Sequence, residues 1–312
     1  MERIRQVQHS ASVSVRYDGD DETDKIVALG GLGPFAEYAD RLGLTGGFAG
    51  AVPYRGVGMP VVDRGGLLVH SLLMLNVGGD CCTDLGMLQA AGGVLGSVGS
   101  ESTFRRMIAD LAKTPGSVGA IDDVMREVRT RVWAEHGWSD PGRRVLMDID
   151  ATLTSVHSEK EDAKGNYKRG FGFHPLACFA DCSGEALAVE HRPGNAGANT
   201  ISDLVGIIDA GLDALPDTVA ESHRPGANTA DAANEILVRS DSAGHTLGFL
   251  WDMWDRNLRF CVTGRSNNIL SGVILGFDEN TNWENALRPH NVDLDDPDPD
   301  VDALKAQVVE VT

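Results

Sequence analysis

Two aspartates one residue apart end a strongly apolar segment of the sequence. Residues 145–152 read VLMDIDAT, so Asp148 and Asp150 follow three apolar residues and flank Ile149. Strand side chains alternate between faces, so this segment, as a strand, places both carboxylates on one face. Two carboxylates at a strand end can hold a hard divalent cation through oxygen ligands. An Asp-rich turn after a strand is the other interpretation of these residues.

A further acid ends a second apolar segment. Residues 235–242 read EILVRSDS, so Asp241 follows another short strand-like stretch. Acids at the carboxyl ends of strands in one sheet can converge on a shared metal site. A strand followed by Asp and Ser is by itself an ordinary turn, so Asp241 is informative only together with the Asp148–Asp150 pair.

Two chemistries share the first pattern. A strand followed by DxDxT opens the haloacid dehalogenase-like phosphohydrolases, which would make Asp148 the nucleophile and Asp150 the general acid or base. Two-metal DNA cleavage uses water or a DNA 3′-hydroxyl as the nucleophile instead. The phosphohydrolase pattern requires glycine where Ala151 stands and a later lysine, yet no lysine follows Lys168 until Lys305. This disfavours the DxD-type phosphohydrolase, which stays an alternative.

The segments around these acids predict an α/β domain. The expected elements run in the order strand, strand, strand, helix, strand, helix, strand, over residues 144–153, 171–180, 186–191, 199–215, 235–239, 246–256 and 258–262. This order fits a mixed sheet. We therefore expect residues 141–312 to form the catalytic core.

Residues 1–140 are expected to form a helical N-terminal region. Helices are predicted over residues 26–42 with a break at 30–34, over 67–77, up to residue 90 with a cap at Asp80 or Thr83, over 103–112 with a cap at Ser100 or Ser102, and over 121–136. The glycine-rich residues 43–59 are expected to be loop. Three short helices in succession permit a helix-turn-helix DNA module with Arg105 and Arg106 on its third helix. A plain helical bundle is the alternative.

Composition limits the kind of partner. The chain has 312 residues and a formal net charge of −19, which argues against a uniformly basic DNA clamp but leaves room for a local basic groove. The odd number of cysteines, five, indicates reduced thiols and a cytoplasmic protein. We find no signal peptide and no apolar run long enough to span a membrane, so no membrane partner is expected.

Several separated stretches of the chain resemble one group of insertion-sequence DDE transposases, the transposase DDE domain group 1. They are, in order, GGDC at 78–81, STFRR at 102–106, DIDAT at 148–152, HSEKE at 157–161, YKRGFGFHPL at 167–176, RPGNA at 192–196 and VRSDSAG at 238–244. The resemblance extends from about residue 25 to the end, and it is specific because several separated motifs occur in the expected order.

The resemblance implies a ribonuclease H-like fold and a metal-dependent DNA transposition enzyme. It implies Asp150 as the first metal-binding acid, Asp148 as a less favoured substitute, and Asp241 as the second acid. The expected cofactor is Mg²⁺ or Mn²⁺. The expected partners are double-stranded DNA, at the transposon ends and the target, and a second copy in a homodimer.

The DNA contacts are expected from cations near the first acid and in the helical region. Lys160, Lys168, Arg169, Arg105 and Arg106 are the candidates, since phosphate contacts come from such side chains. A solvated charged loop is the alternative for the first three.

The third acid of the family, a glutamate on a late helix, has no clear counterpart. Only Glu279, Glu284 and Glu310 follow the second acid, and none has the arginine-rich helical surroundings of the family. We therefore expect a C-terminally truncated copy with little or no transposition of its own, and a non-catalytic DNA-binding remnant as the runner-up.

Overall fold

The computed structural model describes residues 29, 31–56, 62–157, 159–197, 200–228, 230 and 232–264, with isolated positions up to 308. The chain divides into two units, Met1–Thr263 and Gly264–Thr312. In the second unit, the described strands β9 (Glu284–Asn285) and β10 (Gln307–Val308) pair antiparallel. Among the described residues, no helix combines the length and apolar character needed to cross a bilayer.

The first unit begins with helices. They are α1 (Leu32–Arg41), α2 (Leu44–Ala51), α3 (Arg64–Asn76), the 3-10 helix η1 (Cys82–Ala91), α4 (Gly92–Leu95), α5 (Glu101–Leu111) and α6 (Ser117–Glu135). Buried side chains between positions 32 and 111 form one apolar core, which includes Leu67, Leu85, Leu88 and Phe104. The predictions of helices near 67–77, 103–112 and 121–136 are confirmed, and Ser100 caps α5 by accepting a hydrogen bond from the Thr103 N–H at 3.3 Å.

The loop prediction for residues 43–59 is wrong, because α2 lies inside it. Gly43 adopts a left-handed φ of 83° just before the helix. Phe48 is buried in the helical core. A Cβ atom at Gly65 of α3 would lie 2.5 Å from the Thr45 carbonyl oxygen of α2, so the two backbones are in close contact. This packing outweighs the low helix propensity of the glycines.

The segment at 80–91 also differs from its prediction. It is a 3-10 helix capped by Cys81, and neither Asp80 nor Thr83 is its cap. The second member of the expected helix-turn-helix is therefore a 3-10 helix and not an α-helix.

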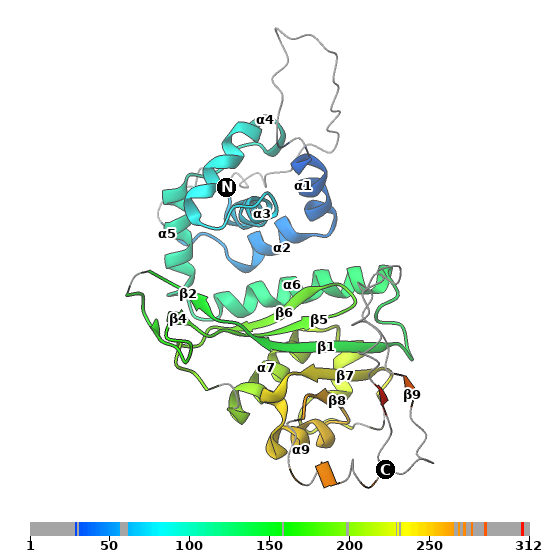
Figure 1. Ribbon diagram of the computed structural model, residues 1–312. Coiled ribbons are helices and arrows are strands. Elements are labelled where there is room, and N and C mark those ends of the chain that lie inside the picture. The colour runs from blue at the N-terminus through cyan, green and yellow to red at the C-terminus, as the bar shows by residue number, and fades with distance from the viewer. Residues whose placement is uncertain are drawn as a thin grey trace, which may run out of the picture. The chain divides into compact units, whose positions relative to one another are not determined.

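A five-stranded mixed sheet follows the helices (Figure 1). It consists of β1 (Arg144–Ala151), β5 (Leu176–Ala180), β6 (Glu185–Glu190), β7 (Glu235–Ser240) and β8 (Arg259–Val262), in the order β6-β5-β1-β7-β8. β5 pairs antiparallel with both β1 and β6, whereas β7 pairs parallel with both β1 and β8. The predicted mixed sheet is confirmed.

One face of this sheet carries the second apolar core. Val145, Met147 and Ile149 of β1 point into it, together with side chains of α7 (Ile201–Ala214), α9 (Leu247–Asp255) and the buried Trp133 of α6. Further short helices complete the connections: α8 (Asp217–Ala220), η2 (Glu221–His223) and η4 (Ser242–Gly244). Because strand side chains alternate, Asp148 and Asp150 lie on the opposite face of the sheet.

The prediction of one strand over residues 171–180 is wrong. The segment is divided into β4 (Phe171–Phe173) and β5, and β4 belongs to a separate three-stranded sheet with β2 (Thr154–Ser155) and β3 (Lys164–Gly165). The break falls at His174 and Pro175, where proline offers no N–H to a ladder. The His174 N–H donates instead to the carbonyl of Arg192, at 3.0 Å. We call residues 154–173 the hairpin arm.

Candidate active site

The parallel pairing of β1 and β7 brings the two predicted acids to the same sheet edge. Ile149 pairs with Ser240 at the last paired position of these two strands. Asp150 follows Ile149 in β1 and Asp241 follows Ser240 as the first residue after β7, so both acids come directly after this paired position. The structure therefore brings together two acids that are far apart in the sequence.

Local hydrogen bonds hold each of these two carboxylates. Oδ1 of Asp150 accepts from the N–H of Ala151 at 2.9 Å. Oδ1 of Asp241 accepts from the N–H of Ala243 at 2.8 Å and so caps η4. Both residues are exposed, and among the described residues neither takes part in an ion pair. Each carboxylate thus has one oxygen fixed to the backbone and a second that can serve as a ligand.

Asp148 has a different environment, because Arg239 stands opposite it on β7. Nε and Nη2 of Arg239 donate to the two Asp148 oxygens at 2.5 and 2.6 Å, and Nη2 also donates to Asp181 at 2.6 Å. The hydrogen bond to Asp148, with that to Asp181, raises the pKa of Arg239 above its ordinary value, so the guanidinium stays charged. Both oxygens of Asp148 are therefore engaged by a cation of the protein.

Sequence reasoning missed Arg239 and Asp181 as members of this cluster. Arg239 lies within the quoted VRSDSAG stretch, but its partner depends on the register between two strands distant in sequence. Asp148 lies two residues before Asp150, and Arg239 lies two residues before Asp241. Aligning the two predicted strands at these acids would therefore have placed Arg239 opposite Asp148.

The two exposed acids fit a hard divalent cation. Carboxylate oxygens are the ligands that Mg²⁺ and Mn²⁺ prefer. Across the part of the chain that the structure describes, only one group of three or more potential ligands has its ligand atoms within 4.8 Å of one another, and it lies elsewhere, at residues 80–84. The side chains of Glu279, Glu284 and Glu310 lie outside the described residues.

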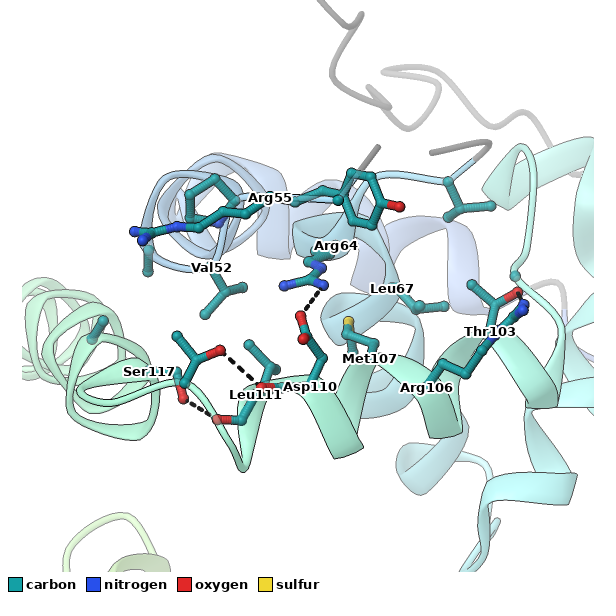
Figure 2. Close-up of a pocket in the computed structure, with 18 of the residues that line it drawn as sticks. Val52, Arg55, Arg64, Leu67, Thr103, Arg106, Met107, Asp110, Leu111 and Ser117 are labelled. Atoms are coloured by element: carbon teal, nitrogen blue, oxygen red, sulfur yellow. Dashed lines mark hydrogen bonds and ion pairs between the residues drawn. The ribbon is translucent and has the colours of Figure 1, made fainter. Parts of the chain in front are cut away.

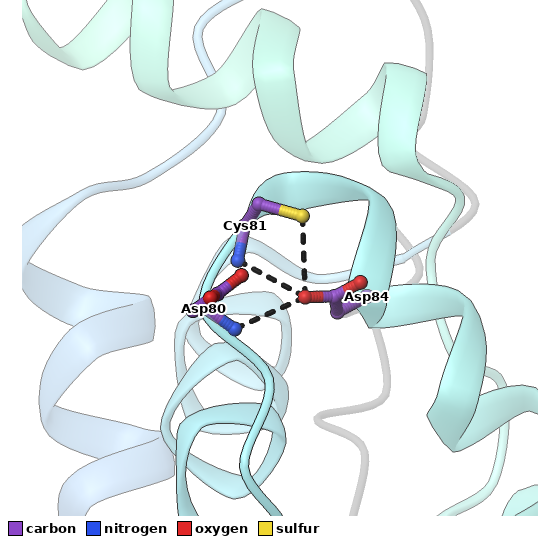
Figure 3. A group of neighbouring side chains, drawn as sticks. All are labelled: Asp80, Cys81 and Asp84. Carbon is purple, nitrogen blue, oxygen red and sulfur yellow. Dashed lines mark hydrogen bonds between the residues drawn. The ribbon is translucent and has the colours of Figure 1, made fainter. Parts of the chain in front are cut away.

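The group at residues 80–84 acts as a helix cap (Figure 3). Oδ2 of Asp84 accepts hydrogen bonds from the backbone N–H of Asp80 at 3.0 Å and of Cys81 at 3.1 Å, and from the Cys81 thiol at 3.1 Å. The bond from the Asp80 backbone, followed by those from Cys81, lowers the pKa of Asp84. The capping of η1 accounts for this arrangement.

The predicted DNA-contacting cations fall into two separate places. Lys160, Lys168 and Arg169 lie on the hairpin arm, which begins just after β1 ends. Arg105 and Arg106 lie on α5 in the helical region, where Arg105 pairs with Glu101 at 2.6 Å. The structure thus places three of the five cations in the segment that follows the first acid.

A groove of about 1080 Å³ lies in the helical region (Figure 2). Arg55, Arg64 and Arg106 line it together with apolar side chains and Asp110. The Arg64 guanidinium pairs with Asp110 and lies 5.2 Å from the centre of the Tyr54 ring. Sequence reasoning singled out only Arg106 here, because Arg55 and Arg64 come from segments that carry no recognisable motif.

Comparisons with known proteins bear on the family. A family model described as transposase DDE domain group 1 matches residues 5–294. No curated protein matches the chain significantly.

The solved structures that resemble the chain do so weakly. A pre-cleavage Mos1 transpososome matches at 9% identity, covering 66% of this chain and 60% of that chain, with a TM-score of 0.24. A Mos1 transposase paired-end complex with the left transposon end matches at 10%, covering 66% and 60%, with a TM-score of 0.23. A Mos1 mariner paired-end complex with Mn matches at 9%, covering 73% and 66%, with a TM-score of 0.23. The chain thus spans 60% of the length of the first two solved chains.

The family match agrees with the architecture. Helices precede a five-stranded mixed sheet, as expected for a ribonuclease H-like core with a helical N-terminal region. The family model covers far more than half of the sequence. The chain belongs to the transposase DDE domain group 1 family.

Proposed function

We propose that this chain is an insertion-sequence transposase in which Asp150 and Asp241 hold a divalent metal, Mg²⁺ or Mn²⁺, for DNA cleavage and strand transfer. The observation that supports the proposal is the Ile149–Ser240 register, because each acid comes directly after one member of this pair. Family membership supports the reaction class. When bound, the metal activates the attacking hydroxyl or water and offsets charge on the phosphate that is cut.

The residues around the acids set the charge of this site. Arg239 donates to both oxygens of Asp148, so Asp148 has no oxygen left without a side-chain partner, whereas Asp150 and Asp241 each keep one. An additional unpaired carboxylate there would repel the DNA phosphate. Asp148 is therefore assigned to the clamp with Arg239, while Asp150 and Asp241 are assigned to the metal.

DNA is the proposed partner despite the net charge of −19. Lys160, Lys168 and Arg169 of the hairpin arm are proposed to contact phosphates beside the metal. The helical region, residues 1–140, is proposed as a second DNA-contacting part through Arg105 and Arg106, and residues 141–312 as the catalytic core. A homodimer would let two copies hold the two ends of one element.

Metal binding tests the site without requiring the full reaction. Titration of the chain with Mn²⁺, followed by electron paramagnetic resonance, is expected to show a site that Asp150→Asn and Asp241→Asn each weaken at least about 10-fold, as expected when one of two charged ligands is lost. Asp255→Asn is the matched control, because Asp255 is an exposed acid at the end of α9. Unchanged Mn²⁺ affinity in Asp241→Asn would refute the assignment.

Cleavage of a plasmid carrying the ends of the element tests the reaction. Metal-dependent nicking at those ends that is lost in Asp150→Asn supports the transposase assignment. Binding of the ends without any nicking, at saturating Mn²⁺, would instead identify the chain as a DNA-binding remnant of a transposase.

A further inference from the structure

The tip of the hairpin arm differs in charge from the rest of the molecule. Residues 164–171 read KGNYKRGF and contain three cations and no acid, in a chain whose net charge is −19. At their centre stands Tyr167, whose side chain is 73% exposed, more than any other aromatic residue that the structure describes. The tip thus offers an exposed aromatic face beside three cations, a combination that proteins use to bind single-stranded nucleic acid.

The turn that presents Tyr167 is held by its own hydrogen bonds. Oδ1 of Asn166 accepts from the N–H of Lys168 at 3.0 Å and from the N–H of Gly170 at 2.9 Å. Arg169 adopts a left-handed φ of 64° to complete the turn. The ring is therefore carried by an ordered backbone, which lowers the entropy lost when a ligand binds.

The base of the arm is joined to the catalytic sheet. The N–H of Gly194 donates to the carbonyl of Gly172 in β4 at 3.1 Å. Arg192 donates through Nε to the carbonyl of His174 at 3.1 Å and through Nη1 to Asp203 of α7 at 2.9 Å. The base of the arm is thus held against the segment that follows β6 and, through Arg192, against α7.

We infer that Tyr167 is a stacking site for a DNA base that has left the duplex beside the cleavage point. Aromatic side chains stack on bases of any sequence, and cations around them hold the adjoining phosphates. Lys168 lies with Nζ 5.7 Å from the centre of the Tyr167 ring, and Lys164 and Arg169 flank it in sequence. Bases inside a duplex are already stacked, so the ring requires an unpaired or extruded one.

This inference rests on the proposed function, because it names the DNA feature that the same site would recognise. The arm begins at Thr154, shortly after Asp150 in the chain, and we take the base at its tip to come from the DNA that the two acids would cut. A tip that bound only the sugar-phosphate backbone would use its cations but have no need of the ring.

Metal-free DNA binding isolates the role of the ring. The probe is a duplex with one unpaired 2-aminopurine, and the fully paired duplex of the same sequence is the reference. Tyr167→Ala is expected to weaken binding to the unpaired probe about 5- to 100-fold and to abolish the fluorescence change of the probe, since base–aromatic stacking has this strength. Binding of the paired duplex is expected to change less than about 3-fold, because phosphate contacts dominate there.

Three further variants make the test selective. Tyr167→Phe keeps the ring and is expected to bind the unpaired probe within about 3-fold of wild type. Tyr38→Ala, which removes another exposed aromatic from α1, is expected to behave as wild type. Asp241→Asn is expected to keep the fluorescence change while losing Mn²⁺, so failure of the metal site and failure of the stacking site are separable. Equal affinity of wild type and Tyr167→Ala for the unpaired probe would overturn the inference.

Discussion

Replacement of Arg239 by methionine removes the clamp between β1 and β7. In the wild type its guanidinium holds both oxygens of Asp148, at 2.5 and 2.6 Å, and one oxygen of Asp181, at 2.6 Å. The three side chains are 41%, 34% and 49% exposed, so solvent screens the interaction and each ion pair contributes at most about 1 kcal/mol. The bidentate geometry places the Asp148 pair near that upper limit.

The loss of Arg239 also leaves two carboxylates that had shared one cation. Two unit charges about 4 Å apart in water repel each other by about 1 kcal/mol, which is the upper limit for this pair. Together with the lost pairing, Arg239→Met is expected to lower the free energy of unfolding by about 1–2 kcal/mol.

A double-mutant cycle measures this interaction directly. Urea unfolding of wild type, Arg239→Met, Asp148→Asn and the double variant at low salt is expected to give a coupling energy of about 1 kcal/mol, which falls in 1 M NaCl. Arg144→Met is the matched control, because Arg144 has a single ion pair, to the half-buried Glu235 across the same two strands, and Glu235 keeps Arg259 as a second partner. Its effect is expected to stay below about 0.5 kcal/mol.

A coupling energy below about 0.3 kcal/mol between Arg239 and Asp148 at low salt would refute this reasoning. The Asp148 carboxylate would then gain nothing from Arg239, and its exclusion from the metal site would lose its physical basis.

Two further predictions concern buried atoms of the core and of the arm. Burial raises the pKa of the Cys178 thiol to about 12, so the unfolded chain loses this proton first and the free energy of unfolding falls above pH 9, by about 1.4 kcal/mol per pH unit. Urea unfolding at pH 8 to 10 should show a shallower decline in Cys178→Ala, and equal slopes would contradict it. Gly194→Ala should destabilise the chain by about 1–3 kcal/mol, because its Cβ would lie 2.4 Å from the Lys164 oxygen and 2.6 Å from that of Gly172. Gly206→Ala, with open space around its Cβ, is the control for the same urea measurement and should not destabilise; equal effects of the two variants would contradict the clash.

The sequence alone determined most local structure of this protein. Alternation of apolar and acidic residues placed Asp148 and Asp150 on one face of a strand, opposite Met147 and Ile149, and the burial of β1 follows that pattern. Ser100 was one of the two predicted caps of α5, and its hydroxyl accepts from a helical N–H in the structure. Family motifs identified the class of protein. These features depend on residues near one another in the chain, so sequence reasoning reaches them.

Only the tertiary structure decided how distant segments meet. The glycine-rich α2 is helical because it packs against α3, and its local propensity gives no sign of this. The strand predicted over residues 171–180 is interrupted at His174, whose backbone N–H donates a hydrogen bond to the carbonyl of Arg192. Above all, the parallel register of β1 and β7 brings Asp150 and Asp241 to the same edge of the sheet and places Arg239 opposite Asp148. Such pairing depends on contacts between residues far apart in sequence, and these form only when the whole sheet assembles.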